Sequence, residues 1–262
     1  MSETTTETLR ARIASVPFWF HSIELAPGVV TPGAKTEQEL ARQLELLDLP
    51  EIAGKSVLDI GAWDGFFSFE AERRGASRVV ALDHFVWSLQ LEPGGVPSPN
   101  DPGAWQPSTL PGKRGFDLAR EALRSEVEEL VTDFMTADPG DIGTFDVVFY
   151  LGVLYHIKDP LGALTRLAQV TREVAVIETQ AIVVPGFDHL ALCEFYETSG
   201  LKNDPTNWWA PNLSALESLC RAAGFARVET KSGPRLSLRY TPWRAHRTRI
   251  VVHAHKAPPE RG

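Results

Sequence analysis

At 262 residues the chain is long enough to bury one substantial core, and its 43% hydrophobic and 23% charged residues are ordinary for a globular protein. No apolar run approaches the ~20 residues of a membrane span, and the N-terminus lacks the apolar stretch of a secretory signal, so we expect a cytoplasmic protein that does not enter membranes. The formal net charge of −8 argues against a large nucleic-acid partner, and the two cysteines lack the spacing of a zinc site.

The N-terminal region predicts a cap ahead of the main domain. Residues 2–14 are polar and fit a short helix, and an aromatic stretch, VPFWFHSIEL, follows it. A second helix is predicted over 36–47, with Thr36 as its N-cap and leucines along one face. Proline and glycine then interrupt the pattern. We therefore expect residues 1–50 to cover the active site of a core domain that spans 51–257.

The rest of the chain alternates between short, nearly continuous apolar runs and amphipathic segments. Such runs are typical of strands buried on both faces of a parallel sheet. Strands are predicted at 56–61, 78–83, 145–152, 173–179, 227–231 and 249–256, and helices at 66–74, 115–130, 160–168 and 213–223. A long loop rich in proline and glycine is predicted over 85–115. This order predicts an α/β fold with a Rossmann-like, seven-stranded, mostly parallel sheet and an antiparallel strand pair at one edge.

Ligands of such sheets bind at the carboxyl ends of the strands, where this chain carries a glycine-containing turn. Trp63 stands where the dinucleotide fingerprint has its middle glycine, which favours S-adenosylmethionine (SAM), a ligand without phosphate, over NAD or FAD. The acid Asp83 ends the second strand, where it could accept both ribose hydroxyls. The predicted donor contacts at the strand ends are Asp59, Gly61, Trp63, Asp64, Gly65, Asp83, His84, Asp133, Phe134 and Leu151.

Three stretches carry a family resemblance: DIGAWDGFFSFEAERRGASRVVALD, FDVVFYLGVLYHIKDPL, and the segment from VIET to NWWAPNLSALESLCRAAGF. They resemble the class I methyltransferase family named for the tRNA wobble-uridine carboxymethyltransferase, over roughly residues 55–230, and the N-terminal region is similar to the shorter members. The resemblance implies a Rossmann-like methyltransferase fold and a SAM-type donor. It also implies that Gly61, Gly65, Asp83 and Tyr155 contact the donor.

Methyl transfer to a hydroxyl or a protonated amine needs a base beside the acceptor. We expect that base among His21, His156 and Glu178, with Tyr155 orienting donor or acceptor. Because Glu178 ends a strand that should be buried, its carboxylate needs a partner. The remaining predicted pocket consists of aromatic side chains, for which core packing is the alternative: Trp19, Phe20, Trp208 and Trp209.

The function predicted from these features is methylation of a small, largely apolar or planar molecule by SAM. One form of it is C-methylation of an isoprenoid diphosphate with Glu178 as the base, and only such a diphosphate acceptor would call for Mg²⁺. The alternatives are a tRNA wobble-uridine methyl- or carboxymethyltransferase, a nucleotide-dependent oxidoreductase and a non-catalytic SAM-binding protein. For the tRNA alternative, the nearest basic stripe consists of Arg235, Arg239, Arg244, Arg247 and Arg249.

Overall fold

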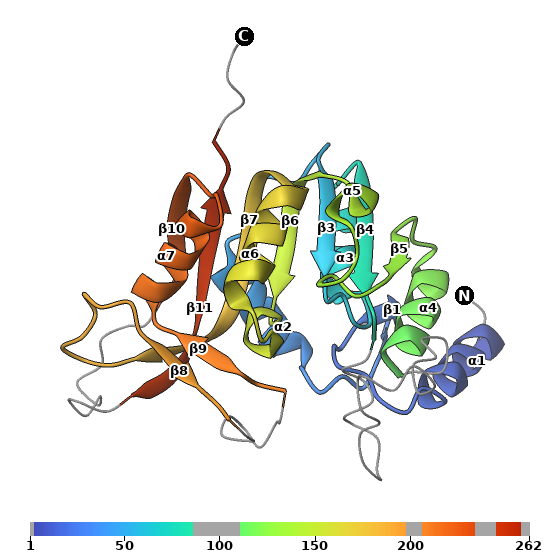
Figure 1. The fold of residues 1–262 in the computed structure, drawn as a ribbon. Coiled ribbons are helices and arrows are strands. Elements are labelled where there is room, and N and C mark those ends of the chain that lie inside the picture. The colour runs from blue at the N-terminus through green and yellow to red at the C-terminus, as the bar shows by residue number, and fades with distance from the viewer. Residues whose placement is uncertain (1–2, 86–110, 198–205, 234–244, 258–262) are drawn as a thin grey trace. The chain divides into compact units, whose positions relative to one another are not determined.

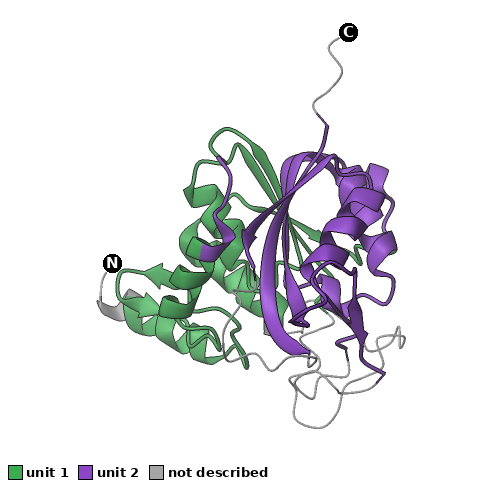
Figure 2. Ribbon diagram, turned by 90° about the vertical axis from the view of Figure 1, so that its left-hand side faces the viewer, with its two compact units in different colours: residues 1–45, 52–136 green, residues 46–51, 137–262 purple. Residues whose placement is uncertain are grey.

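The computed structural model describes residues 3–85, 111–197, 206–233 and 245–257 of the chain (Figure 1). Most of the loop predicted over 85–115, three of the tail arginines and both chain ends therefore lie outside the described residues. The chain divides into two compact units (Figure 2). Unit 1 comprises residues 1–45 and 52–136, and unit 2 comprises residues 46–51 and 137–262. The seven-stranded, mostly parallel sheet expected from the sequence is present.

Unit 1 carries the first three strands of that sheet. Its elements are α1 (Glu3–Ala14), β1 (Glu24–Ala26), β2 (Val29–Val30), most of α2 (Glu37–Leu47), β3 (Ser56–Ile60), α3 (Phe66–Arg73), β4 (Arg78–Asp83), α4 (Pro111–Leu123) and β5 (Glu128–Val131). Strands β3, β4 and β5 are parallel and lie in that order, and α3 packs on β3 and β4. Their carboxyl ends therefore share one edge of the sheet.

Unit 2 carries the other four strands, in the order β10-β11-β7-β6. Its elements are α5 (Pro139–Ile142), β6 (Phe145–Leu151), the 3₁₀ turn η3 (Leu154–His156), α6 (Pro160–Val170), β7 (Thr171–Val183), β8 (Cys193–Phe195), β9 (Trp209–Pro211), α7 (Leu213–Ala222), β10 (Arg227–Ser232) and β11 (His246–His255). Strands β6 and β7 are parallel, whereas β11 runs antiparallel to both β7 and β10. The C-terminal antiparallel pair and strand β7 were both predicted, but the pairing of β11 with β7 was not.

Helix boundaries follow local capping chemistry. Thr36 and Glu39 form a reciprocal capping box at the start of α2, in which each side chain accepts a hydrogen bond from the other residue's backbone N–H. Asp159 caps α6 by accepting from the Gly162 N–H at 2.9 Å, and Asn212 caps α7 by accepting from the Ala215 N–H at 2.9 Å. These helix starts agree with the sequence prediction.

The helix predicted over 115–130 is wrong at both ends. The helix begins earlier, at Pro111, and ends at Leu123, because Arg124 takes a left-handed conformation with φ +52°. The chain then turns and pairs with β4 as strand β5. Only hydrogen bonding to β4 makes this segment a strand, since its side chains are exposed or half-buried and show no apolar run.

The core of each unit is formed mainly by strand residues that exclude solvent completely or nearly so. In unit 2 the β6 residues Val147, Val148 and Phe149 are fully buried. Cys220 is buried, but Cys193 is exposed, and both thiols are free. Within the described ranges, no helix combines the length and apolar character that crossing a bilayer requires.

Candidate functional site

The predicted donor residues of unit 1 meet at the shared edge of β3, β4 and β5. Asp59 pairs with Ala81 in the parallel register, and Asp83 pairs with Val131. The loop from Gly61 to Gly65 follows β3 and leads into α3. These residues, which the sequence spreads along the chain, are therefore brought together within one unit.

Asp59 is a buried acid that has no cationic partner among the described residues. Its side chain is 2% exposed and accepts a hydrogen bond from the Ser68 hydroxyl at 2.7 Å. Burial raises the pKa of Asp59 to about 7; the Ser68 hydrogen bond lowers it and the charge of Asp83 raises it further. A nearby ammonium group would favour the ionised form, so Asp59 fits the amino group of a methionine moiety.

Asp83 is held by the backbone of the same loop region. Its carboxylate accepts hydrogen bonds from the Trp63 N–H at 2.9 Å and from the Phe85 N–H at 2.6 Å. His84 is half-buried, with Nδ1 3.4 Å from the Asp83 carboxylate. Since each carboxylate oxygen has two acceptor sites, Asp83 keeps capacity for the ribose hydroxyls predicted for it.

Backbone geometry accounts for the two glycines of the loop. Gly61 and Gly65 have φ of +78° and +88°, which favour glycine. A Cβ at Gly65 would also lie 2.6 Å from the Phe69 ring and 2.8 Å from the Phe116 ring. Gly65 precedes α3 without a side-chain cap, and the Ser68 N–H in the first turn bonds Asp59, so the N–H groups that could receive an anion such as a carboxylate are those of Phe66 and Phe67.

Trp63 combines two unfavourable features in this loop. Its backbone has φ +51°, which is uncommon for a bulky residue, and among the described residues its buried indole N–H has no hydrogen-bond partner. Its ring packs on Phe20, with ring centroids 5.2 Å apart, and on Phe18, 6.2 Å away. Strain of this kind concentrates at binding sites, and it supports the predicted donor role of the loop.

Trp63→Phe and Trp19→Phe are expected to differ in stability by about 2 kcal/mol, with the Trp19 variant less stable. Both substitutions remove the same volume and the same N–H group. In the part of the chain that the structure describes, the Trp63 indole N–H has no partner, whereas the Trp19 indole N–H donates to the Ile13 carbonyl at 3.1 Å, so only the second loss breaks a bond. Urea unfolding of the two variants measures the difference, and equal losses would contradict a hydrogen-bonding origin.

Asp64 and His21 form a buried, hydrogen-bonded polar pair in unit 1. Asp64 is 1% and His21 4% exposed, and the Asp64 carboxylate lies 2.5 Å from His21 Nδ1. The same carboxylate accepts the backbone N–H groups of Phe20 and His21 at 2.8 and 2.9 Å. The N-terminal aromatic segment is thus fixed to the predicted donor loop.

The other predicted unit 1 residues lie in two environments. Trp19 is buried at 2% exposure, with its ring 3.3 Å from where a Cβ of Gly115 would stand, and Phe20 is half-buried. Asp133 and Phe134 follow β5; Asp133 accepts the Met135 N–H at 2.8 Å and Phe134 is buried. Their contacts with donor or acceptor stay predictions.

In unit 2, Glu178 is ion-paired with Arg249, a partner that the sequence analysis did not identify. Glu178 is 4% exposed and receives two hydrogen bonds from the guanidinium, from Nε and, at 2.5 Å, from Nη2. Burial alone would lower the pKa of Arg249, but the hydrogen bond to Glu178 and its charge outweigh burial and hold that pKa above its ordinary value. The pair is bidentate and fixes the orientation of both groups.

Tyr155 joins this pair at Gly152. The Arg249 guanidinium carbon lies 5.4 Å from the centre of the Tyr155 ring. A Cβ at Gly152 would be 3.5 Å from the Tyr155 hydroxyl, 3.5 Å from Arg249 Nη2 and 3.9 Å from the Glu178 carboxylate, so all three polar groups converge there. Leu151, predicted to contact the donor, is half-buried and pairs with Glu178 in the register of β6 and β7.

His156 and the two tryptophans lie along the adjoining segment. His156 Nδ1 is 2.9 Å from the Thr206 hydroxyl, and its ring centre is 4.3 Å from that of Tyr155. The backbone N–H of Trp208 donates to the Tyr155 carbonyl at 2.8 Å. The indole N–H of Trp209 donates to the Lys158 carbonyl at 3.1 Å. Tyr155, His156 and Glu178 are thus brought together in unit 2, whereas His21 belongs to the unit 1 cluster.

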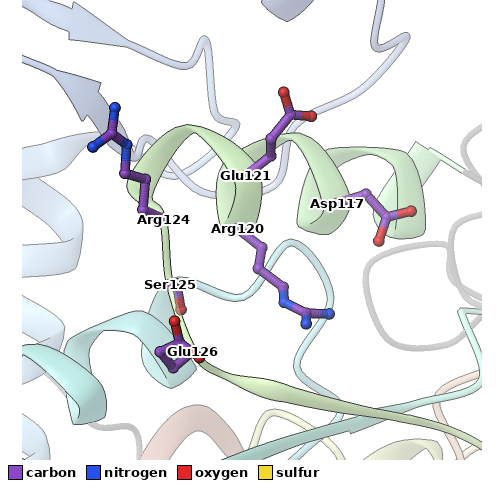
Figure 3. Close-up of a pocket in the computed structure, with 6 residues that line it drawn as sticks. All are labelled: Asp117, Arg120, Glu121, Arg124, Ser125 and Glu126. Atoms are coloured by element: carbon purple, nitrogen blue, oxygen red, sulfur yellow. The ribbon is translucent and has the colours of Figure 1, made fainter.

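A cavity of about 350 Å³ lies along α4 and the turn after it in unit 1 (Figure 3). It is open and lined by charged groups, and none of the predicted site residues contributes to it: the lining residues are Asp117, Arg120, Glu121, Arg124, Ser125 and Glu126. Three of the lining charges are paired with residues outside the lining: Asp117 with Lys113, Arg120 with Glu129 and Glu121 with Arg12. Over the part of the chain that the structure describes, no group of three or more acids, histidines or cysteines is arranged to hold a metal ion.

Comparisons with known proteins agree with the fold. A family model described as a methyltransferase domain matches residues 33–230. The tRNA U34 carboxymethyltransferase of Pseudomonas savastanoi is 29% identical over 68% of this chain and 47% of its own length, and that of Geobacter sp. is 24% identical over 73% and 52%. The chain thus spans about half the length of the curated relatives it matches.

Solved structures show the same architecture at lower identity. The N-terminal domain of EvdMO1, crystallised with S-adenosylhomocysteine (SAH) and D-fucose, has a TM-score of 0.62 at 17% identity and covers 98% of both chains. An O-methyltransferase family protein from Burkholderia thailandensis has a TM-score of 0.53 at 15% identity, over 85% of this chain and 57% of its own. These likenesses establish the fold.

Proposed function

Because the chain belongs to the methyltransferase-domain family, and is a SAM-dependent methyltransferase by family and fold, we propose that it methylates a small, largely apolar or planar molecule. The observation that carries the proposal is the aromatic cluster beside the loop from Gly61 to Gly65. Phe18 and Phe20 pack on Trp63, while Phe66 and Phe67 pack around His21. Rings gathered at the edge of a donor site suit a planar acceptor.

The residues of unit 1 fit a SAM donor. The bound donor would supply an electrophilic methyl group on a sulfonium. Asp59 would face its ammonium group, the N–H groups of Phe66 and Phe67 at the start of α3 would receive its carboxylate, and Asp83 would hold its ribose. The protein's main contribution is then to align acceptor and donor and to exclude water.

C-methylation of an isoprenoid diphosphate with Glu178 as the base is a less favoured form of the proposal. Both oxygens of Glu178 accept a hydrogen bond from Arg249, which fixes the carboxylate in an orientation that faces the guanidinium. A proton acceptor needs a free lone pair directed at the substrate. We therefore assign Glu178 to fixing Arg249 and Tyr155, and Mg²⁺ would matter only for a diphosphate acceptor.

The second candidate is a tRNA U34 methyl- or carboxymethyltransferase, since relatives at 29% identity bear the carboxymethyltransferase name. Two observations favour the small molecule over it. The net charge is −8, and Arg247 and Arg249, the described arginines of the basic tail, are paired with Glu194 and Glu178. Backbone phosphates need unpaired cations in a stripe.

The test is turnover of methyl-labelled SAM, offered separately with bulk tRNA and with a set of small phenols and sugars. Calorimetry should first detect binding of SAH. Incorporation into a small molecule, with little dependence on salt, supports the proposal. Incorporation into tRNA that falls steeply with rising salt would instead establish the second candidate.

A further inference from the structure

His21 and Asp64 have the geometry of an oriented histidine base. The Asp64 carboxylate is 2.5 Å from His21 Nδ1, so this nitrogen carries a proton that the carboxylate accepts. That tautomer leaves a lone pair on Nε2. Among the described residues, Nε2 has no hydrogen-bond partner. Nε2 is also not fully buried, so another group can reach it.

A structural role explains only part of this arrangement. The N-terminal segment is already attached to the loop by the backbone N–H groups of Phe20 and His21, both donated to Asp64. The imidazole is not needed for that attachment. Its ring is nevertheless held on several sides, by Asp64 at Nδ1, by Phe66 stacked 5.5 Å away and by Phe67 edge-on at 5.6 Å. Only Nε2 is left for a reacting group.

We propose that His21 is the catalytic base for methyl transfer to a hydroxyl group and that Asp64 is its positioning residue. This rests on the proposed function, since Asp64 stands in the predicted donor loop between Trp63 and Gly65. The acceptor oxygen forms a bond to the donor methyl carbon while the carbon–sulfur bond breaks, and the electron pair of that bond stays on sulfur. The hydroxyl proton passes to Nε2 and then to water. The acceptor class is therefore a phenol or another planar hydroxyl compound.

Phenol and thiophenol serve as probe acceptors of similar shape. Phenol must lose its proton during transfer, whereas thiophenol is largely ionised at slightly alkaline pH and needs no base. His21→Gln is expected to lower phenol methylation by about 10²–10⁴-fold, the usual contribution of a general base, while thiophenol methylation stays near the unsubstituted rate. The matched control is His253→Gln, a buried histidine of unit 2 that bonds the Leu47 carbonyl; it should leave both rates unchanged.

A second readout does not depend on turnover. In ¹⁵N-histidine-labelled protein, NMR should show that Nδ1 of His21 carries a proton and that Nε2 carries none in the tautomer bonded to Asp64. Asp64→Asn should move the proton to Nε2, because the amide can donate to Nδ1, and should lower phenol methylation while the backbone contacts persist. An Nε2–H tautomer in the unsubstituted protein would overturn the proposal.

The outcomes separate this inference from the proposed function. If the protein fails to bind SAH, the proposed function itself is wrong. If it binds SAH but methylates no phenol, or if His21→Gln lowers the phenol and thiophenol rates equally, the base role is overturned while the donor assignment stands. Selective loss of phenol methylation, with SAH affinity retained, supports the base.

Discussion

Replacing Asp59 by asparagine is expected to stabilise the donor-free protein in mildly alkaline solution and to weaken SAH binding in the same step. Burial raises the pKa of Asp59 to about 7 in the folded chain, above its ordinary 3.8. Between these values the folded state binds more protons than the unfolded state, so stability falls as pH rises. The loss approaches about 4 kcal/mol above neutrality, and asparagine avoids it.

Denaturant unfolding between about pH 5 and about pH 8 measures the first effect. The protein should lose stability across this range, and the Asp59→Asn variant should lose much less. Asp141→Asn, which removes an exposed carboxylate from α5, is the matched control and should leave the slope unchanged. A slope that persists in Asp59→Asn would show that another group titrates.

Calorimetry with SAH measures the second effect. The variant cannot offer a carboxylate to the ligand's ammonium group, and a hydrogen bond to a charged group contributes about 1.5–3 kcal/mol, so the affinity should fall about 10- to 100-fold. Unchanged affinity would place the ammonium elsewhere. A substitution that stabilises the fold and weakens binding identifies a residue that serves ligand binding rather than stability. This combination of effects distinguishes a binding role of Asp59 from a structural role.

Much of the fold follows from local patterns in the sequence. Continuous apolar runs predict β3, β4, β6 and β7, because strands covered on both faces need them. Side-chain caps predict where α2, α6 and α7 begin, since a capping oxygen acts within three residues of its own position. Strand β5 was not predicted, because it lacks such local patterns. Its exposed and half-buried side chains carry no periodic signal, and only its pairing with β4 makes it a strand.

The candidate site was predicted in its parts but not in its pairings. Glycine spacing and acids at strand ends indicate the loop at 61–65 and Asp83. The partner of Asp64, however, stands 43 residues earlier in a segment without regular periodicity. Arg249 is 71 residues from Glu178 and reaches it only because β11 pairs with β7 rather than with β10 alone. The register that sets this contact depends on sheet order, which no local pattern contains.

Removing Arg249 should destabilise the protein more than removing any comparable surface arginine. Arg249→Met would leave the Glu178 carboxylate buried and unpaired, which costs about 3–5 kcal/mol in such pairs. We expect about 3 kcal/mol, the lower end, because the Arg249 side chain is 37% exposed and water can replace part of the lost interaction. Arg247→Met is the control; its pair with Glu194, at 3.5 Å with 49% and 31% of the side chains exposed, should contribute no more than about 1 kcal/mol.

A second substitution at Glu178 distinguishes an unpaired charge from lost packing. If the buried charge causes the loss, Glu178→Gln combined with Arg249→Met should recover most of the stability that Arg249→Met loses, because the double variant buries no charge. If packing of the Arg249 guanidinium on the Tyr155 ring dominates, the double variant should be no more stable than Arg249→Met alone. Denaturant unfolding of the four proteins in this cycle gives the coupling energy directly. A coupling below about 0.5 kcal/mol would contradict the assignment of Glu178 as the group that fixes Arg249.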